Sequence, residues 1–202
     1  MLASGSPRRR ELLAGLGVTF SVRVPDVDEA PLPNEDPLVY VERLARAKAA
    51  AAGAGAGAGG PPSVEVVLAA DTTVALAGVI LGKPRDAGEA SVMLRALSGR
   101  THQVHTGVAV LSDRGLISSV TTTEVTFRML TSDEIAAYVA TGDPLDKAGA
   151  YGIQGDAGRF VGALTGSLSN VVGLPMAQTA ALLSAAGLDT VTWGPPRLDL
   201  TF

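Results

Sequence analysis

The sequence predicts an α/β domain in which helices flank a mixed, strongly bent sheet. Residues 64–70 form a continuous apolar run, interrupted by Glu65, whose β-branched residues are typical of a buried strand. Residues 102–111 and 116–127 alternate like two paired strands. Helical segments are interspersed among the strands without regular strand–helix–strand repeats, which favours mixed pairing. With 47% hydrophobic residues in a chain of 202, we expect residues 1–202 to form a single domain.

Helix start signals place the first helix close to the N-terminus. Ser6 is a suitable N-cap, Pro7 suits the first helical position, and Gly15 follows the expected end at Ala14. A second helix begins at Pro37 and presents one face through the spaced residues Leu38, Val41, Leu44, Ala45 and Lys48. Capping patterns and terminal glycines predict further helices at residues 86–98, 131–142 and 175–187.

Shorter strands are expected at residues 19–24, 79–81, 160–164 and 190–193, where apolar and β-branched residues lie between turn residues. Before the buried strand, residues 53–60 read GAGAGAGG and are followed by two prolines. Such a low-complexity tract is typical of a flexible loop. We therefore expect residues 53–62 to lie outside the core and to be dispensable.

Charge and composition exclude several classes of protein. The formal net charge is −4 and the pI is near 5.1, whereas a protein that binds duplex nucleic acid normally presents a basic patch, so we expect no nucleic-acid partner. The absence of cysteine excludes disulfides, thiolate metal sites and a cysteine nucleophile. The sequence has no apolar run of the ~20 residues that a membrane helix needs and no signal-peptide pattern. We expect a cytoplasmic protein without a membrane partner.

Local sequence rules fail at positions that are candidates for function. Arg8, Arg9 and Arg10 lie in the opening turn of a helix, where cations oppose the helix dipole. They are either solvated surface arginines or, with backbone N–H groups and the Ser6 hydroxyl, the binding site of an anion such as phosphate. The pattern does not separate these alternatives. Asp71 stands where the buried strand is expected to end, a place where ligands bind in open α/β sheets, although a loop aspartate is the common case.

Other polar residues interrupt apolar or glycine-rich patterns. In the segment DKAGAYGIQG the glycines allow backbone to approach a ligand closely, and Asp146, Lys147 and Gln154 supply polar groups. Lys83 lies between Gly and Pro, which usually marks a turn. Lys48 continues an apolar helix stripe, which snorkelling explains.

Two further patterns do not predict a site. His102 and His105 are an odd number of residues apart in an expected strand, so they point to opposite faces and are poor ligands for one metal. For Ser6 the sequence identifies no histidine base, which argues against serine-hydrolase chemistry. The remaining carboxylates, lysines and arginines suit metal-assisted phosphate chemistry, but they do not name a reaction.

The chain resembles the Maf family over nearly its whole length. The resemblance rests on ordered segments that are weak singly and specific together: LASGSPRRRELL, VDE, AADTTV, LGKPRDAGEA, LSGRTHQVHTGV, DKAGAYGIQG and GSLSNVVGLP. It implies a fold similar to inosine triphosphate pyrophosphatases, with two lobes around a nucleotide cleft. Because the chain begins almost at the LAS motif, we expect a shorter first strand than is usual in the family.

The resemblance also implies an activity, the cleavage of the α–β phosphoanhydride of nucleoside triphosphates to a monophosphate and pyrophosphate. It implies three catalytic residues: Asp71, as acceptor of a proton from the attacking water, Lys83 and Lys147. The implied substrate-binding residues are Ser6, Arg8, Arg9, Lys48, Thr72, Asp146 and Gln154. A divalent cation, Mg or Mn, is implied as cofactor, with Glu29 and Asp71 as its oxygen ligands. A homodimer is also implied.

Certain positions separate two kinds of Maf enzyme by resemblance. Arg8 follows SP, Thr72 follows the implied catalytic aspartate and Gln154 lies in YGIQG, as in the kind that acts on dTTP and UTP. A neutral glutamine amide can pair with the acceptor and donor edge of uracil or thymine. We therefore expect hydrolysis of dTTP and UTP, with house-cleaning of non-standard nucleotides as a further role. The alternatives are a preference for 7-methyl-GTP, a general phosphatase, and a non-catalytic nucleotide-binding regulator of cell division.

Overall fold

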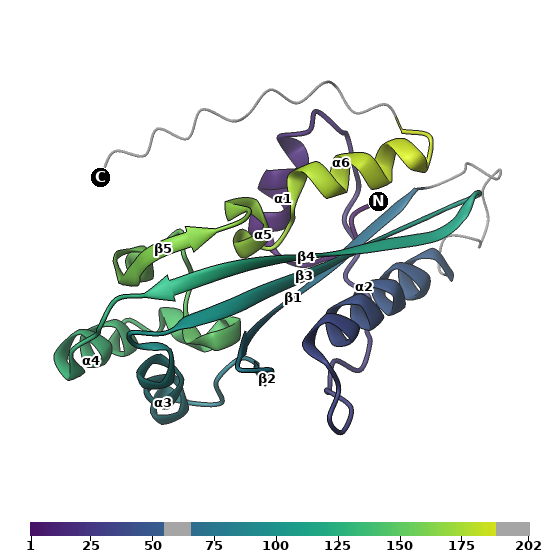
Figure 1. Cartoon of the computed structure of the whole chain (residues 1–202). Helices are drawn as coiled ribbons and strands as arrows, with labels where there is room; N and C mark the ends of the chain where they lie inside the picture. Colours follow the sequence, from purple (N-terminus) through teal and green to yellow (C-terminus); the bar gives the residue numbers. More distant parts are fainter. Residues whose placement is uncertain (55–65, 189–202) are drawn as a thin grey trace.

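The computed structural model describes residues 1–54 and 66–188. Its strands form a five-stranded sheet in the order β2-β1-β3-β4-β5 (Figure 1). The strands are β1 (Val67–Leu76), β2 (Val79–Leu81), β3 (Thr101–Ser112), β4 (Gly115–Phe127) and β5 (Val161–Thr165). The α-helices are α1 (Pro7–Ala14), α2 (Pro37–Ala54), α3 (Ala87–Leu97), α4 (Ser132–Ala140), α5 (Leu168–Val172) and α6 (Met176–Ala185). Short 3-10 helices are η1 (Asp143–Asp146), η2 (Ala148–Ala150) and η3 (Asp156–Phe160).

Neighbouring strands of the sheet pair antiparallel throughout. The parallel component is limited to bridges from Leu2 to Val22 and to Leu68. The long strands β3 and β4 extend along the length of the molecule, with helices on both sides (Figure 1). The predicted α/β class, a sheet with flanking helices, is confirmed. None of the helices in the two described ranges is long and apolar enough to cross a membrane.

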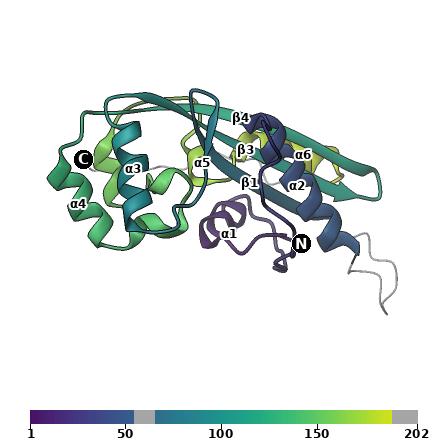
Figure 2. The ribbon, with the colours of Figure 1, turned by 90° about the horizontal axis from the view of Figure 1, so that it is seen from below.

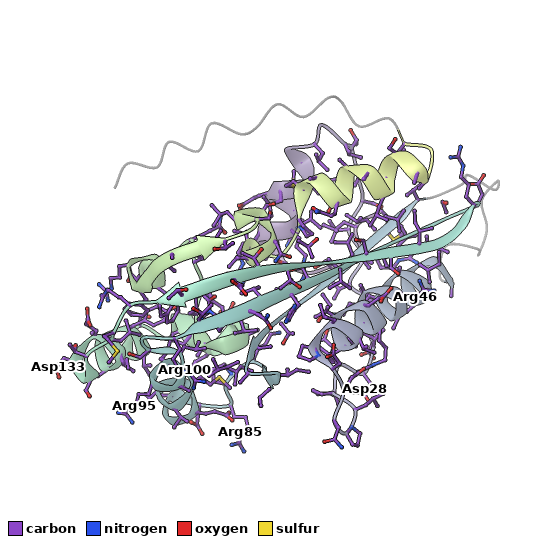
Figure 3. The ribbon with its side chains drawn as sticks, in the orientation of Figure 1. Asp28, Arg46, Arg85, Arg95, Arg100 and Asp133 are labelled. Carbon is purple, nitrogen blue, oxygen red and sulfur yellow. The ribbon has the colours of Figure 1, made fainter. Side chains whose placement is uncertain are left out.

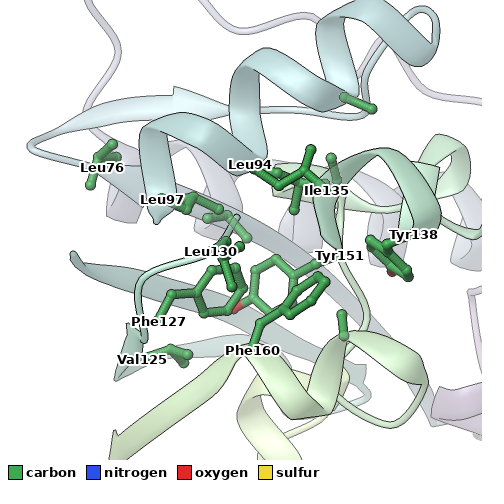
Figure 4. Packing of buried hydrophobic residues seen from close by; sticks show 14 of the residues in the cluster. Leu76, Leu94, Leu97, Val125, Phe127, Leu130, Ile135, Tyr138, Tyr151 and Phe160 are labelled. Atoms are coloured by element: carbon green, nitrogen blue, oxygen red, sulfur yellow. The ribbon is translucent and has the colours of Figure 1, made fainter. Parts of the chain in front are cut away.

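The helices divide into two groups along the sheet. Figure 2 shows α3 and α4 at one end, α2 and α6 at the other, and α1 between them. The α3–α4 end encloses an aromatic core in which Phe127, Tyr138, Tyr151 and Phe160 pack together (Figure 4). At the other end, α1 and α6 pack on one face of β1 and β3, while alanines of α2 cover the opposite face. The two ends correspond to the two expected lobes.

Local signals located most helices correctly. The helix α1 has the predicted bounds, and the Ser6 hydroxyl accepts a hydrogen bond from the backbone N–H of Arg9 (3.4 Å), as an N-cap does. In α4, Thr131 and Glu134 form the predicted capping box. The short helix α5 was not predicted, although its N-cap, Ser167, is a residue type typical of that position.

Other predictions need correction. Residues 19–24 do not form a strand, because Leu2 offers this segment one bridge, at Val22, and its Val22 and Val24 side chains stay 42% and 68% exposed. The helix α2 continues to Ala54, so the start of the tract predicted as a loop is helical. Leu38, expected on the buried face of α2, is 42% exposed because it lies in the first turn, at the edge of the packed surface. The rest of that tract and residues 190–193 lie outside the described residues.

Candidate active site

Asp71 lies inside β1, and not at the end of the buried strand as the sequence pattern predicted. The strand continues because Asp71, Thr72 and Thr73 remain in the ladder with β3, where Asp71 pairs with Gly107. Gly107 in turn allows α2 to approach, since a Cβ there would collide with the backbone carbonyl of Val41. This close packing places α2 over the β1 residue that carries the carboxylate.

The opposite edge of β1 is open beside Asp71. Leu68 is bridged to Leu2, and pairing with β2 begins at Val74. Between these points no strand of the described ranges covers β1, because the N-terminal segment turns away into α1. Backbone and side chains at this edge of β1 therefore face a space between the two lobes.

A cavity of about 700 Å³ occupies this space. All the predicted site residues line it: Ser6, Arg8, Arg9, Glu29, Lys48, Asp71, Thr72, Lys83, Asp146, Lys147 and Gln154. They come from α1, the segment before α2, α2, β1, the turn after β2, and the segment from η1 to η3. The structure thus brings together residues that are widely separated in the sequence, while their chemical roles stay predictions.

Several charged residues that do not line the cavity lie on the periphery. Figure 3 labels Arg85, Arg95, Arg100 and Asp133, whose side chains lie at the outside of the α3–α4 end. In the cavity, by contrast, the cationic side chains outnumber the carboxylates. An acidic protein therefore keeps a locally basic cleft, which suits a small anion.

Lys48 links the two carboxylates that were predicted to bind metal. Its ammonium lies 2.7 Å from Asp71 Oδ1 and 2.5 Å from Glu29 Oε1. The side chains of Lys48 and Asp71 are each 10% exposed, and that of Glu29 is 52% exposed. The interpretation of Lys48 as a snorkelling residue is therefore wrong, because its ammonium is paired inside the cavity and does not extend to bulk solvent.

The segment that carries Glu29 is fastened to α2. The Tyr40 hydroxyl donates a hydrogen bond to the backbone carbonyl of Glu29 (3.0 Å), and Arg43 forms an ion pair with Glu35 (2.6 Å) and donates to the carbonyl of Ala30 (3.2 Å). Sequence reasoning did not single out Tyr40 or Arg43. Glu35 precedes α2, which begins at Pro37, whereas Arg43 lies within it. Helical periodicity therefore gave no signal for this pair.

The two carboxylates have opposite pKa shifts. Burial raises the pKa of Asp71, and the charge and hydrogen bond of Lys48 and the charge of Arg9 oppose this only in part. For Glu29, burial acts in the same direction, but the hydrogen bond and charge of Lys48 and the charge of Lys83 outweigh it and lower the pKa. The surroundings of Asp71 thus make it a stronger base than a free aspartate, while those of Glu29 favour its anionic form.

Arg9 is part of the cavity wall. Its Nε donates to the carbonyl of Gly173 (2.8 Å), one Nη to the Ser4 hydroxyl (3.1 Å) and the other to the Thr72 hydroxyl (2.9 Å). Thr72 also exchanges a hydrogen bond with Thr106 (2.9 Å). Burial lowers the pKa of Arg9, and the charge of Asp71 opposes this shift. The helix α1 therefore holds a guanidinium beside Asp71 in a fixed position, with some of its N–H donors already hydrogen-bonded to protein.

Lys147 forms the other cationic end of the cavity. Its ammonium donates to the backbone carbonyl of Asp143 (2.6 Å), to Asp143 Oδ1 (2.8 Å) and to Asp146 Oδ1 (2.7 Å). The Tyr138 hydroxyl donates to the second carboxylate oxygen of Asp143 (2.7 Å). Sequence reasoning missed Asp143 and Tyr138. The spacing of Asp143 and Lys147, four residues, was a usable signal, since such pairs meet on one helical turn.

Two of the remaining predicted residues are exposed. Lys83 is exposed in the turn after β2, and Gln154 is exposed in the segment before η3. A smaller cavity of about 300 Å³ adjoins the main one and is lined by Arg8, Asp143, Lys147 and Gln154, among others. The two histidines point apart as predicted: His102 Nε2 lies 2.8 Å from the Tyr151 hydroxyl, whereas His105 Nδ1 lies 2.9 Å from the Thr122 hydroxyl.

The donor set fits a hard divalent cation that keeps several other ligands. In the described part of the chain, no group of three or more His, Asp and Glu side chains forms a metal site. Glu29 and Asp71 offer two carboxylates on one side of the cavity, and Lys48 marks the point between them where a positive charge is favoured. Mg²⁺ is commonly held by one or two carboxylates, with water and substrate phosphates completing its coordination.

The fold and cavity define an α/β protein with a basic cleft between two lobes, which suits a phosphorylated small molecule. A family model described as "Maf-like protein" matches residues 1–186 of the chain. The chain is 54% identical over 200 residues, 97% of either chain, to a dTTP/UTP pyrophosphatase of Anaeromyxobacter dehalogenans (strain 2CP-C). It is 56% identical over 188 residues to one of Myxococcus xanthus (strain DK1622), covering 93% of this chain and 92% of the other. One from Escherichia coli O157:H7 is 55% identical over 183 residues, 91% of this chain and 90% of the other. The chain belongs to the Maf family, which confirms the resemblance.

Proposed function

We propose that this protein hydrolyses dTTP and UTP to the monophosphate and pyrophosphate. The observation that carries the proposal is the cavity in which Lys48 joins Asp71 to Glu29 and which all the other predicted residues line. The three relatives described above carry the name dTTP/UTP pyrophosphatase, and each aligns with more than nine tenths of this chain.

The residues of the cavity can supply what this reaction needs. A triphosphate carries about four negative charges, and its cleavage depends mainly on positioning and charge neutralisation. Lys48, Arg9, Lys147 and Arg8 all line the cavity, so their positive charges are available to the phosphates. Asp71, with its raised pKa, is suited to accept the proton of the attacking water.

A divalent metal, Mg or Mn, is part of the proposal. Glu29 and Asp71 would hold it, and when bound it would supply charge neutralisation to the phosphates. The charge and hydrogen bond of Lys48 lower the pKa of Glu29 and favour its anionic form, which a metal ligand needs. Such a role for Asp71 is compatible with proton acceptance, since its Oδ1 atom faces Lys48 and a carboxylate has a second oxygen.

Base recognition is assigned to Gln154, which lies near Arg8 and Lys147 in the smaller adjoining cavity. The Gln154 side chain is exposed at the cavity, and within the described residues it has no hydrogen-bond partner, which leaves its amide available to a ligand. An amide can match the donor and acceptor edge of thymine or uracil. A site built on such pairing rejects a base that leaves these polar groups unpaired.

The test is a substrate panel of natural and methylated nucleoside triphosphates, scored for pyrophosphate and for inorganic phosphate. We expect dTTP and UTP to have the highest kcat/KM and 7-methyl-GTP a low one. A matched Gln154→Glu variant should raise KM for dTTP more than it changes kcat. Release of inorganic phosphate would instead indicate a general phosphatase, and nucleotide binding without turnover would indicate a regulator. Cytoplasmic localisation and a homodimer stay predictions.

A further inference from the structure

The ammonium of Lys147 has no free hydrogen left for a ligand. An ammonium has three N–H donors, and those of Lys147 are engaged by the Asp143 carbonyl, the Asp143 carboxylate and the Asp146 carboxylate. Contact with a substrate phosphate therefore requires that one of these hydrogen bonds be exchanged. The structure indicates which partner stays and which one yields.

Asp143 is the anchored partner. Both of its acceptor groups hold Lys147, and its second carboxylate oxygen accepts a 2.7 Å hydrogen bond from the Tyr138 hydroxyl. Tyr138 is fully buried in the aromatic core, where its ring packs edge-on against Phe160 at 5.3 Å between centroids (Figure 4). A rigid core residue thus fixes the carboxylate, and the carboxylate fixes the lysine.

Asp146 is the weakly held partner. Its side chain is 74% exposed, against 40% for Asp143. Exposed ion pairs contribute little to stability because solvent screens them. An incoming phosphate oxygen can therefore replace Asp146 on the ammonium at small cost, while both Asp143 bonds remain.

The backbone at Gly152 also helps to hold the side chain of Lys147 in place. A Cβ on Gly152 would lie 2.7 Å from Lys147 Cε and 2.8 Å from its Cδ, so the lysine stem occupies the space that a larger residue would fill. The N–H of Gly152 also donates to the Tyr138 hydroxyl (3.4 Å). The same hydroxyl therefore connects the lysine anchor with the segment that leads to Gln154.

We propose that Asp143, held by the Tyr138 hydroxyl, is a positioning residue that aims Lys147 at the substrate phosphates. This inference rests on the proposed function, in which Lys147 contacts the triphosphate. Asp143 acts through Lys147 and touches no substrate itself. The irregular segment between η1 and η2 can consequently present a lysine with the precision of a regular element, because its anchor Asp143 is held by a residue of the aromatic core.

A double-mutant cycle tests the inference. Asp143→Asn keeps the shape and the Tyr138 contact but removes the charge that holds the ammonium. We expect it to lower kcat/KM for dTTP by about tenfold in the parent and by less than about twofold in a Lys147→Met background, because residues that act as a unit are not additive. Equal losses in both backgrounds would overturn the proposal.

The hydroxyl of Tyr138 is tested separately from the packing of its ring. Tyr138→Phe should lower kcat/KM by roughly threefold to tenfold through looser positioning of Asp143. The matched control is Phe160→Leu, which disturbs the same aromatic core and keeps the hydroxyl. It should lower Tm but leave kcat/KM within about twofold at a temperature where both variants are folded. Equal losses of kcat/KM in the two variants would show a general packing effect and overturn the proposal.

The double-mutant cycle of Asp143→Asn and Lys147→Met can also be measured by binding, as the Kd of the non-hydrolysable analogue α,β-imido-dTTP with Mg²⁺. This second readout separates the inference from the proposed function. A parent that releases no pyrophosphate from any triphosphate would contradict the proposed function, whereas the affinity cycle would still decide the role of Asp143. Coupling in the Kd values supports the positioning role, and additive Kd changes reject it.

Discussion

The two cationic ends of the cleft are built in different ways. Lys48 projects from the regular helix α2, is buried, and bridges Asp71 and Glu29. Lys147 projects from the irregular segment between η1 and η2, and its partners Asp143 and Asp146 are 40% and 74% exposed. The first end combines a buried ion pair with packed secondary structure, whereas the second depends on a chain of hydrogen bonds from an aromatic core.

The difference shows how the same charge can serve stability at one end and positioning at the other. Removing a buried partner leaves an uncompensated charge, which is costly. Removing an exposed partner leaves a charge that water can solvate. We therefore expect changes at the Lys48 end to affect folding and chemistry together, and changes at the Lys147 end to affect mainly the chemistry.

The largest effect is expected from Asp71→Asn, which removes the basicity and the charge at the Lys48 end. General base catalysis contributes about 10²–10⁴-fold, so kcat for dTTP should fall by about 10²–10⁴-fold. Circular dichroism and size-exclusion chromatography should still show a folded protein, since asparagine preserves the shape, although its free energy of unfolding should fall because buried Lys48 loses a partner. Turnover within a few-fold of the parent would show that Asp71 is not the proton acceptor.

The next largest effect concerns stability and separates the two lysines. Lys48→Met removes the ammonium that pairs with buried Asp71 and leaves only the charge of Arg9 to oppose its burial, so the free energy of unfolding should fall by about 3 kcal/mol at pH 7. Lys147→Met should cost less than about 1 kcal/mol, because its carboxylate partners are reached by solvent. Urea denaturation of both variants measures the difference. Equal losses of unfolding free energy in the two variants would show that the ion pairs of Lys48 and Lys147 contribute equally to stability.

The core beneath the Lys147 end should be sensitive to acid. Burial lowers the pKa of His102 from 6.5 to about 4, so the unfolded chain binds the proton more readily than the folded protein in this range. Stability from the neutral imidazole is present above pH 6.5 and is lost as pH falls toward 4. Between pH 7 and 5 this term amounts to about 2 kcal/mol.

The matched variant for that prediction is His102→Gln, in which the titrating group is absent. The free energy of unfolding of the parent should fall more steeply between pH 7 and 5 than that of the variant. Parallel pH profiles would show that His102 does not titrate on unfolding in the expected way. Carboxylates elsewhere titrate in both proteins, so the comparison removes their contribution.

The smallest effect is expected from Gly152→Ala at the Lys147 end. The added methyl group would meet the lysine stem at 2.7 Å, and the ammonium cannot move without breaking a hydrogen bond. A displacement of this order lowers activity by roughly tenfold, within the range known for misplaced catalytic groups. Initial rates with dTTP measure it, and Gly155→Ala, whose Cβ would meet no atom closer than 3.6 Å, is the matched control for stability.

Sequence patterns located the Lys48 end more completely than the Lys147 end. The helical spacing of Val41, Leu44, Ala45 and Lys48 and the apolar run before Asp71 are local signals, and both elements exist as helix and strand. The sequence did not show that β1 continues through Asp71, because the pairing of that residue with Gly107 is a long-range feature of the sheet. The same holds for the residues 19–24, which alternate like a strand but have one bridge to the rest of the sheet.

The partners of the lysines were harder to predict than the lysines. Motif resemblance placed Lys147 and Asp146 in the site, but the anchoring of Lys147 depends on where Tyr138 sits in the folded core. Tyr138 carries an ordinary helical signal and gives no sign of a polar role. Likewise, the Tyr40 contact with Glu29 depends on the path of an irregular segment that local propensity does not determine.

In the proposed reaction the cleft directs water to the α-phosphorus of a pyrimidine triphosphate, with Asp71 accepting the proton. Hydrolysis of dTTP in water enriched in oxygen-18, followed by mass spectrometry of both products, tests this most directly. We expect one labelled oxygen in the thymidine monophosphate and none in the pyrophosphate, with the reaction lost in Asp71→Asn. Label in the pyrophosphate, or in released inorganic phosphate, would place the attack on a different phosphorus atom and contradict the account.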